Sequence, residues 1–173
     1  MVTSVQVTFS GLVVLDAGAV RMTRTRDGVA VELTVSSQVV VGGNSVVTFG
    51  FAAGGATYAL NAGGFALTDG VYGLAITASR VRAAGSNLWL NGDGVGGDYA
   101  HGADPAHRFW RLFGDADGNG KVDGNDTFYF RQAFGVGQPA NIDLRSLFDF
   151  DGNGVLNAAD SGQFKLRFGR AVK

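Results

Sequence analysis

Two twelve-residue stretches near the C-terminus repeat one pattern of oxygen-bearing side chains, over residues 115–126 and again over residues 149–160. Positions one, three, five, nine and twelve are Asp or Asn, and position six is Gly. Ca²⁺ takes roughly six to eight oxygen ligands, which a tight loop supplies from alternate side chains, one backbone carbonyl and a closing carboxylate. The repeat therefore predicts two Ca²⁺ sites, with Lys121 and Val155 contributing backbone oxygen to these ligand sets: Asp115, Asp117, Asn119, Lys121, Asp123 and Asp126; Asp149, Asp151, Asn153, Val155, Asn157 and Asp160.

The charge of these stretches favours a cation. The first places four carboxylates in twelve residues and the second places three. Crowded like charges raise the free energy of the folded chain unless a cation neutralises them. Polar turns select the same residue types. Because two copies match at every ligand position, we interpret them as metal loops and not as simple turns.

A short helix is predicted after each loop. Asp126 and Asp160 would open these helices, where an acid meets the positive end of the helix dipole, and Gly135 and Gly169 would end them. Phenylalanines four residues apart lie on one helix face. We therefore expect the two helices to pack through their phenylalanines, which are Phe130, Phe134, Phe164 and Phe168.

The paired loops and helices over about residues 112–170 resemble a dockerin. Dockerins are non-enzymatic modules that bind cohesin modules and attach secreted proteins, often carbohydrate-active enzymes, to scaffolds or cell surfaces. The resemblance implies a cohesin-like partner and an association with polysaccharide degradation. It places the partner-binding residues at loop positions ten and eleven and at a basic residue in each helix: Gly124, Asn125, Arg131, Ala158, Ala159 and Lys165. The best-known dockerins have a Ser-Thr-like pair at positions ten and eleven.

An EF-hand pair is the structural alternative, because LFGDADGNG and LFDFDGNG also resemble an entering helix that runs into its loop. Three features favour the dockerin-like form. Gly114 directly precedes the first loop, Pro105 limits the length of an entering helix, and position twelve is Asp where an EF-hand usually has Glu. The apolar face of such entering helices would consist of Leu112, Phe113, Leu147 and Phe148.

Residues 1–104 are predicted to be all-β. Apolar residues alternate with polar ones over residues 5–9 and 29–35, and Asp27-Gly28 between such runs predicts a hairpin turn. Many short strands with frequent turns are typical of a β-sandwich. We expect further strands around residues 19–25, 38–41, 45–51, 65–67, 71–78 and 88–90.

The segments VQVTFS and DGVYGLAI in this region resemble strands of bacterial immunoglobulin-like modules, which act as spacers or adhesion platforms. The expected fold is thus mostly β plus small α: an immunoglobulin-like β-sandwich over residues 1–104, a linker over 105–111, and a two-helix dockerin-like paired calcium-loop module over 112–173. In the alternative function, the sandwich is adhesive or binds a cell-surface glycan and the calcium tail is purely structural. Its candidate aromatic platform is Tyr58, Tyr72 and Trp89, although large aromatics mostly serve packing.

Composition narrows the function classes. The chain has 173 residues, no cysteine and a formal charge of -1, which indicates neither a disulfide scaffold nor a nucleic-acid partner. Glu32 is the only glutamate and no nucleophile motif occurs, so we expect no enzyme. No apolar run is long enough for a membrane span.

The start MVTSVQVTFS lacks the features of a signal peptide. We expect the C-terminal part of a larger exported protein, located extracellularly or at the cell surface. The loop NGDGVGGD also offers Asn91, Asp93 and Asp98 as oxygen ligands for a third calcium ion, with a plain glycine-rich loop as the alternative.

Overall fold

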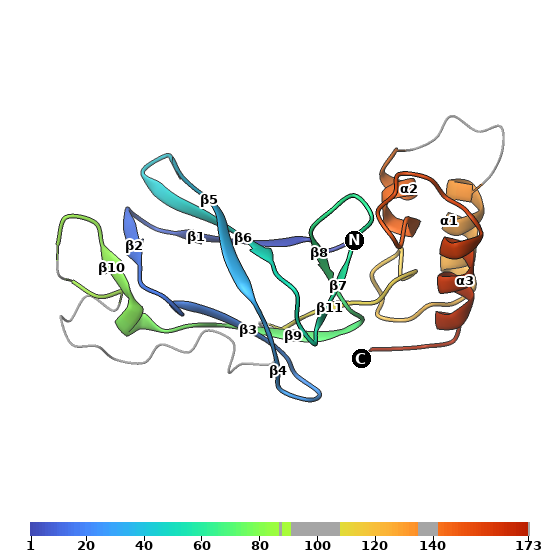
Figure 1. Ribbon diagram of the computed structural model, residues 1–173, viewed down its shortest axis with the longest axis horizontal. Helices are drawn as coiled ribbons and strands as arrows, with labels where there is room; N and C mark the ends of the chain where they lie inside the picture. The colour runs from blue at the N-terminus through green and yellow to red at the C-terminus, as the bar shows by residue number, and fades with distance from the viewer. Residues whose placement is uncertain (87, 91–107, 135–141, 173) are drawn as a thin grey trace.

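The computed structural model describes residues 1–86, 88–90, 108–134 and 142–172 (Figure 1). A β-rich N-terminal region is followed by a short helical C-terminal part. The β-rich region contains β1 (Ser4–Phe9), β2 (Val13–Leu15), β3 (Val20–Arg24), β4 (Val29–Val31), β5 (Leu33–Val41), β6 (Asn44–Phe51), β7 (Thr57–Ala59), β8 (Phe65–Leu67), β9 (Gly70–Ile76), the 3-10 turn η1 (Ala78–Arg80), β10 (Val81–Ala83) and β11 (Phe109–Arg111). The helical part contains α1 (Gly124–Phe134), α2 (Ile142–Phe148) and α3 (Ala158–Arg167).

The strands pair antiparallel in several small sheets. Their orders are β1-β6-β5, β11-β9-β3-β4, β10-β2 and β7-β8. The β character predicted for this region is confirmed. The described strands do not by themselves define a closed sandwich, so the immunoglobulin-like assignment stays a prediction.

The expected hairpin turn lies between β3 and β4. Gly28 has a φ of +67°, a conformation that glycine adopts without strain. Asp27 accepts hydrogen bonds from Arg24 Nε at 3.0 Å and from Arg24 Nη2 at 2.9 Å. Arg24 is buried, and its Nη1 also donates to Thr68 Oγ1 at 2.7 Å. The turn therefore neutralises a buried guanidinium.

The alternating run over residues 29–35, which the sequence presents as one strand, is divided between two sheets. β4 pairs with β3, whereas β5 pairs with β6. The change of sheet occurs at Glu32, whose carbonyl accepts a hydrogen bond from Ala52 N at 3.0 Å. The expected strand at 88–90 is reduced to a single bridge between Trp89 and Arg82.

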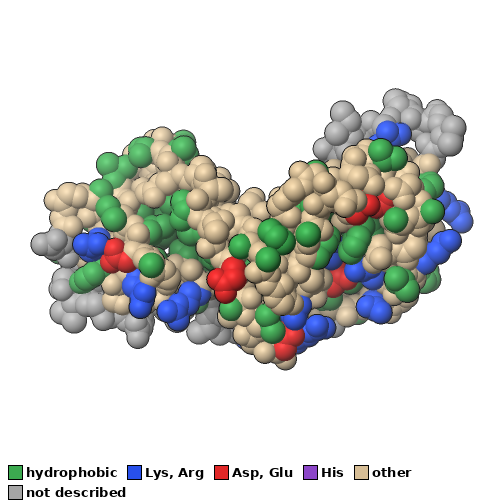
Figure 2. Space-filling view, viewed as in Figure 1, with side chains coloured by type: hydrophobic (Ala, Val, Ile, Leu, Met, Phe, Trp, Pro, Cys, Tyr) green, Lys and Arg blue, Asp and Glu red, His purple; other side chains and the backbone are tan. Residues whose placement is uncertain are grey.

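The free edge of the three-stranded sheet is apolar. β5 is exposed along most of its length, and Val39, Val40 and Val41 at its end are 49%, 62% and 59% exposed. Hydrophobic side chains gather over this end of the molecule in Figure 2. The apolar side chains at this end of β5 are thus only partly covered by the described residues.

The helical part has an apolar core of its own. The predicted aromatic pairing is confirmed for Phe130 and Phe164, whose rings stack 4.4 Å apart with an interplanar angle of 6°. Phe134 and Phe168 are 38% and 55% exposed, and their rings contact Phe130 and Phe164, respectively, four residues earlier in the chain. The buried members of this core are Leu112, Phe113, Val122, Ala133, Phe148 and Phe164.

The expectation of two helices is wrong, because α2 precedes the second loop. Its Phe148 is fully buried and meets Phe130 and Phe164 edge-on, with ring centroids 5.2 and 5.7 Å apart. This is the entering helix that the EF-hand alternative predicts for the second loop. The residues described just before the first loop, 108–114, are not helical, and 109–111 of the expected linker form β11, which pairs with β9.

An ion pair between Asp69 and Arg167 joins the two parts of the chain. Asp69, between β8 and β9, accepts hydrogen bonds from Arg111 and from Arg167 of α3. Both guanidinium groups are largely withdrawn from water, since Arg111 and Arg167 side chains are 5% and 13% exposed. The backbone N of Phe113 donates to the same carboxylate at 2.9 Å. The helical part therefore meets the β-rich region at a largely buried cluster in which two guanidinium groups share one carboxylate.

Candidate metal centre

Three carboxylates converge in each of the two acidic loops. One oxygen from each of Asp115, Asp117 and Asp126 lies within 4.8 Å of the others, and the same holds for Asp149, Asp151 and Asp160. These are positions one, three and twelve of each predicted loop. Each group could hold a metal ion, and carboxylate oxygen suits a hard cation such as Ca²⁺.

The closing carboxylates are buried and tie each loop to the helix that follows. Asp126 and Asp160 are both 0% exposed and lie in the first turns of α1 and α3. Asp126 accepts from Ala116 N at 2.7 Å and from Asp123 N at 2.8 Å. Asp160 accepts from the matching donors, Phe150 N at 2.8 Å and Asn157 N at 2.9 Å. Each side chain thus fixes both ends of its loop.

The aspartates at position one make different hydrogen bonds in the two loops. Asp115 Oδ2 accepts from Gly120 N at 2.9 Å and from Trp110 Nε1 at 3.1 Å. Its Oδ1 is buried and has no hydrogen-bond partner among the described residues. Asp149 Oδ2 accepts from Gly154 N at 2.8 Å, and its Oδ1 accepts from Gly152 N at 2.9 Å.

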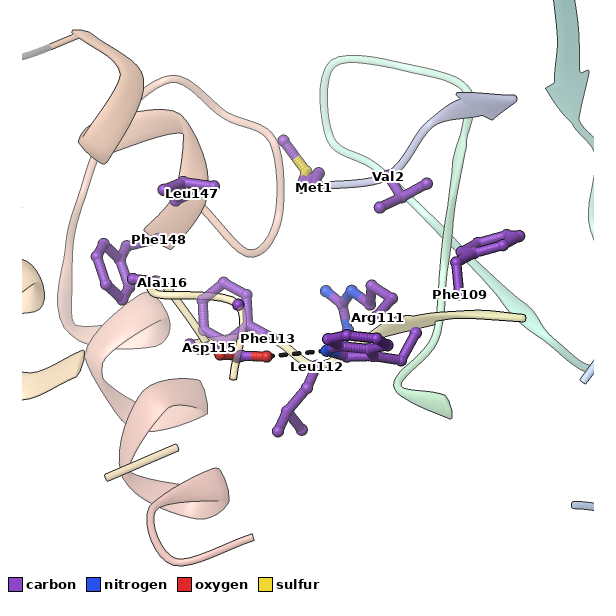
Figure 3. A pocket seen from close by; sticks show the side chains of 13 residues that line it. Met1, Val2, Phe109, Arg111, Leu112, Phe113, Asp115, Ala116, Leu147 and Phe148 are labelled. Atoms are coloured by element: carbon purple, nitrogen blue, oxygen red, sulfur yellow. Dashed lines mark hydrogen bonds between the residues drawn. The ribbon is translucent and has the colours of Figure 1, made fainter. Parts of the chain in front are cut away.

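A buried carboxylate oxygen without a partner raises the free energy of the folded state. Asp115 also borders a cavity of about 360 Å³ that is lined mainly by apolar side chains, including Met1, Phe113 and Phe148 (Figure 3). The indole hydrogen bond to Asp115 is drawn there. A cation bound to the unpartnered Oδ1 of Asp115 would offset this free-energy cost, so the residues present fit a metal ion.

Positions three and five repeat the same bonds in both loops. Asn119 Nδ2 donates to Asp117 Oδ2 at 2.9 Å, and Asn153 Nδ2 donates to Asp151 Oδ2 at 3.0 Å. The oxygens of both asparagines accept the backbone N of position seven, at 2.8 and 2.7 Å. Glycines with positive φ make this tight path possible, at position six as predicted and also at position four: Gly118, Gly120, Gly152 and Gly154.

Position nine caps the helices. Asp123 Oδ1 accepts from Asn125 N at 2.9 Å, and Asn157 Oδ1 accepts from Ala159 N at 2.7 Å. Asn157 is the N-cap of α3 and forms a capping box with Asp160. Asp123 is not among the converging carboxylates. A ligand at position nine often acts through a water molecule, so the predicted metal role of these two residues stays a prediction.

Position eight of the first loop is paired with the chain that follows α3. Val122 N donates to Arg170 O at 2.9 Å, and Gly169 N donates to Val122 O at 2.8 Å. Gly169 has a φ of +82°, as expected for a residue that ends a helix. The first loop is therefore closed by the C-terminal segment, a contact that the sequence did not indicate. Gly135 lies outside the described residues.

The six predicted partner-binding residues are all exposed. Four of them, Gly124, Asn125, Ala158 and Ala159, begin α1 and α3, and Arg131 and Lys165 lie further along the same helices. Lys and Arg side chains are visible along the outer edge of the helical part in Figure 2.

The other candidate sites receive less support. Tyr72 is fully buried, and Tyr58 stacks on Phe150, so neither is an open platform for a sugar. Trp89 is the third candidate for the platform, and the guanidinium carbon of Arg82 lies over its ring, 5.6 Å from the ring centroid. The third calcium candidate, Asn91, Asp93 and Asp98, lies outside the described residues.

Comparison of the chain with family models, curated proteins and solved structures finds no match. Within the part of the chain that the structure describes, no helix is long and apolar enough to cross a membrane. Fold and site together define a β-rich region followed by a helical part with two acidic groups that could each hold a metal ion.

Proposed function

We propose that the helical part binds two Ca²⁺ ions, one in each loop, and that the ions stabilise it. The observation behind the proposal is the convergence of three carboxylates in each of two matching loops. The unpartnered oxygen of Asp115 supports it independently. The backbone oxygens of Lys121 and Val155 would complete the two shells at position seven.

Bound calcium would add to the stability of the folded chain. At free calcium one hundred times the dissociation constant, each site would contribute about 2.7 kcal/mol. This contribution is large for a part of the chain whose core consists of a few apolar side chains. The ions would therefore be structural and would hold α1 and α3 together.

We further propose that this calcium-stabilised part is a dockerin-like docking module of a secreted or cell-surface protein, and not an enzyme. Its partner would be a cohesin-like module. The exposure of the residues that begin α1 and α3 supports this, because a docking surface must be open to solvent. The β-rich region would act as an immunoglobulin-like spacer.

An EF-hand-type calcium protein is the second candidate, and α2 favours it, because this helix runs into the second loop. A sensor of that type exposes new hydrophobic surface when calcium binds. A hydrophobic dye should then show increased fluorescence on calcium addition. The docking proposal expects no such increase.

Binding to a panel of purified cohesin modules, measured by surface plasmon resonance with calcium and with chelator, tests the docking function. We expect calcium-dependent binding that disappears in Asp115→Ala and Asp149→Ala. The matched control is Asp16→Ala, since Asp16 pairs with Arg82 in the β-rich region. No binding in calcium, or binding that survives the chelator, would count against the proposal.

A further inference from the structure

The two acidic loops have different surroundings. The turn between β7 and β8 lies against the second loop, where Asn61 N donates to Asp151 O at 2.8 Å and Asn61 Nδ2 donates to Asp151 Oδ2 at 2.9 Å. Asp117, the equivalent residue of the first loop, accepts side-chain hydrogen bonds within its own loop. Asp117 is exposed, whereas Asp151 is half-buried.

The residues on either side of Asp151 also contact the β7–β8 hairpin. A Cβ at Gly152 would lie 3.3 Å from Leu60 Cβ, whereas a Cβ at Gly118, its equivalent in the first loop, would meet nothing within 4 Å. Phe150 on the other side of Asp151 stacks on Tyr58. Three consecutive loop positions therefore rest on one hairpin of the β-rich region.

We propose that Asn61 is a positioning residue of the second calcium site. This inference rests on the proposed calcium binding. Asp151 Oδ2 is shared by the amides of Asn61 and Asn153, so two donors fix the plane of this carboxylate. Donors behind a ligand orient it, and their removal typically weakens metal binding by roughly 10–100-fold.

The coupling must be reciprocal. If the β7–β8 hairpin strengthens calcium binding at the second loop, calcium at that loop strengthens the contact with the hairpin by the same factor. The second ion would thereby hold the helical part against the β-rich region. The first ion would not strengthen the contact with this hairpin, because none of the described contacts of its loop involves the hairpin; its loop meets the β-rich region through Trp110 of β11 instead.

The test is a calcium titration of the whole chain followed by NMR, with Gly120 and Gly154 as reporters. Each of their amides donates to the first aspartate of its own loop, at 2.9 and 2.8 Å, so each loop is observed separately. In Asn61→Ala we expect the Gly154 transition to shift to roughly 10–100-fold higher calcium and the Gly120 transition to stay in place. Asn44→Ala, at the first residue of β6, is the matched control.

Hydrogen exchange provides the reciprocal readout in the wild-type chain. Exchange of the Asn61 amide should slow when calcium is added, should still slow in Asp115→Asn, and should no longer respond in Asp149→Asn. Equal calcium affinity at Gly154 in wild type and Asn61→Ala would overturn the inference while leaving the calcium proposal intact. No transition at either glycine in the wild-type chain would overturn both.

Discussion

Tyr58 of β7 and Phe150 of the second acidic loop lie face to face, with ring centroids 4.8 Å apart and an interplanar angle of 6°. The Tyr58 hydroxyl also donates to Phe150 O at 3.1 Å. Arg111 and Arg167 lie over the Phe150 ring, at 5.9 and 5.0 Å from its centroid. One loop residue thus connects the predicted calcium site to the charge cluster that joins the two parts of the chain.

Truncation of the Tyr58 side chain should lower the stability of the folded chain. Tyr58→Ala removes the stacked ring and the hydroxyl donor, and we expect a loss of about 2–4 kcal/mol in the free energy of unfolding, measured with urea. Tyr58→Phe, the matched variant, keeps the ring and should lose only about 1 kcal/mol. Equal stability of both variants would show that the stacking of Tyr58 on Phe150 does not contribute to the free energy of unfolding.

The core of the helical part should depend on Phe164, which is 4% exposed. Phe164→Ala should lower the free energy of unfolding by about 3–5 kcal/mol, because the cavity left in the aromatic cluster cannot collapse fully. Phe168→Ala, at the residue that directly follows α3 and is 55% exposed, should change it by less than about 1 kcal/mol. Urea titration of both variants in chelator measures the difference without a contribution from calcium.

Gly114 should tolerate no side chain. Its φ is +93°, and an added Cβ would lie 2.8 Å from Phe164 Cδ2. Gly114→Ala should therefore destabilise the chain more than Gly118→Ala, which has a φ of +73° but open space around it. The backbone strain alone costs about 1–2 kcal/mol. Thermal unfolding of the two variants compares them, and an equal shift in Tm would mean that the contact with Phe164 relaxes freely.

The contact between Arg24 and Asp27 in the β3–β4 turn should make the free energy of unfolding depend on pH. Hydrogen bonds from Arg24 lower the pKa of Asp27 from its usual 3.8 to about 2. Because the folded state holds this carboxylate ionised, its contribution to stability is full above pH 3.8 and is lost as the pH falls toward about 2. Carbon-detected NMR titration of the Asp27 carboxyl should give a midpoint near 2. A midpoint near 3.8 would mean that Arg24 does not hold Asp27 in solution.

The loops could be predicted because their chemistry is local. Ligand-type residues and glycines within twelve positions define the turn, and the apolar spacing after each loop defines a helix face, so α1, α3 and the Phe130–Phe164 pair followed from the sequence. The short α2 followed only from the EF-hand alternative and not from the favoured interpretation, since a seven-residue helix contains too few apolar positions to show a period. Asn61 and Asp151 lie far apart in the chain, and only the tertiary fold brings them together.

The most direct test of the account is a calorimetric titration of the whole chain with Ca²⁺ after removal of metal with a chelator. We expect two ions to bind per chain and one to bind in Asp126→Asn or in Asp160→Asn. A chain that is fully folded and takes up no calcium at millimolar concentration would contradict the account.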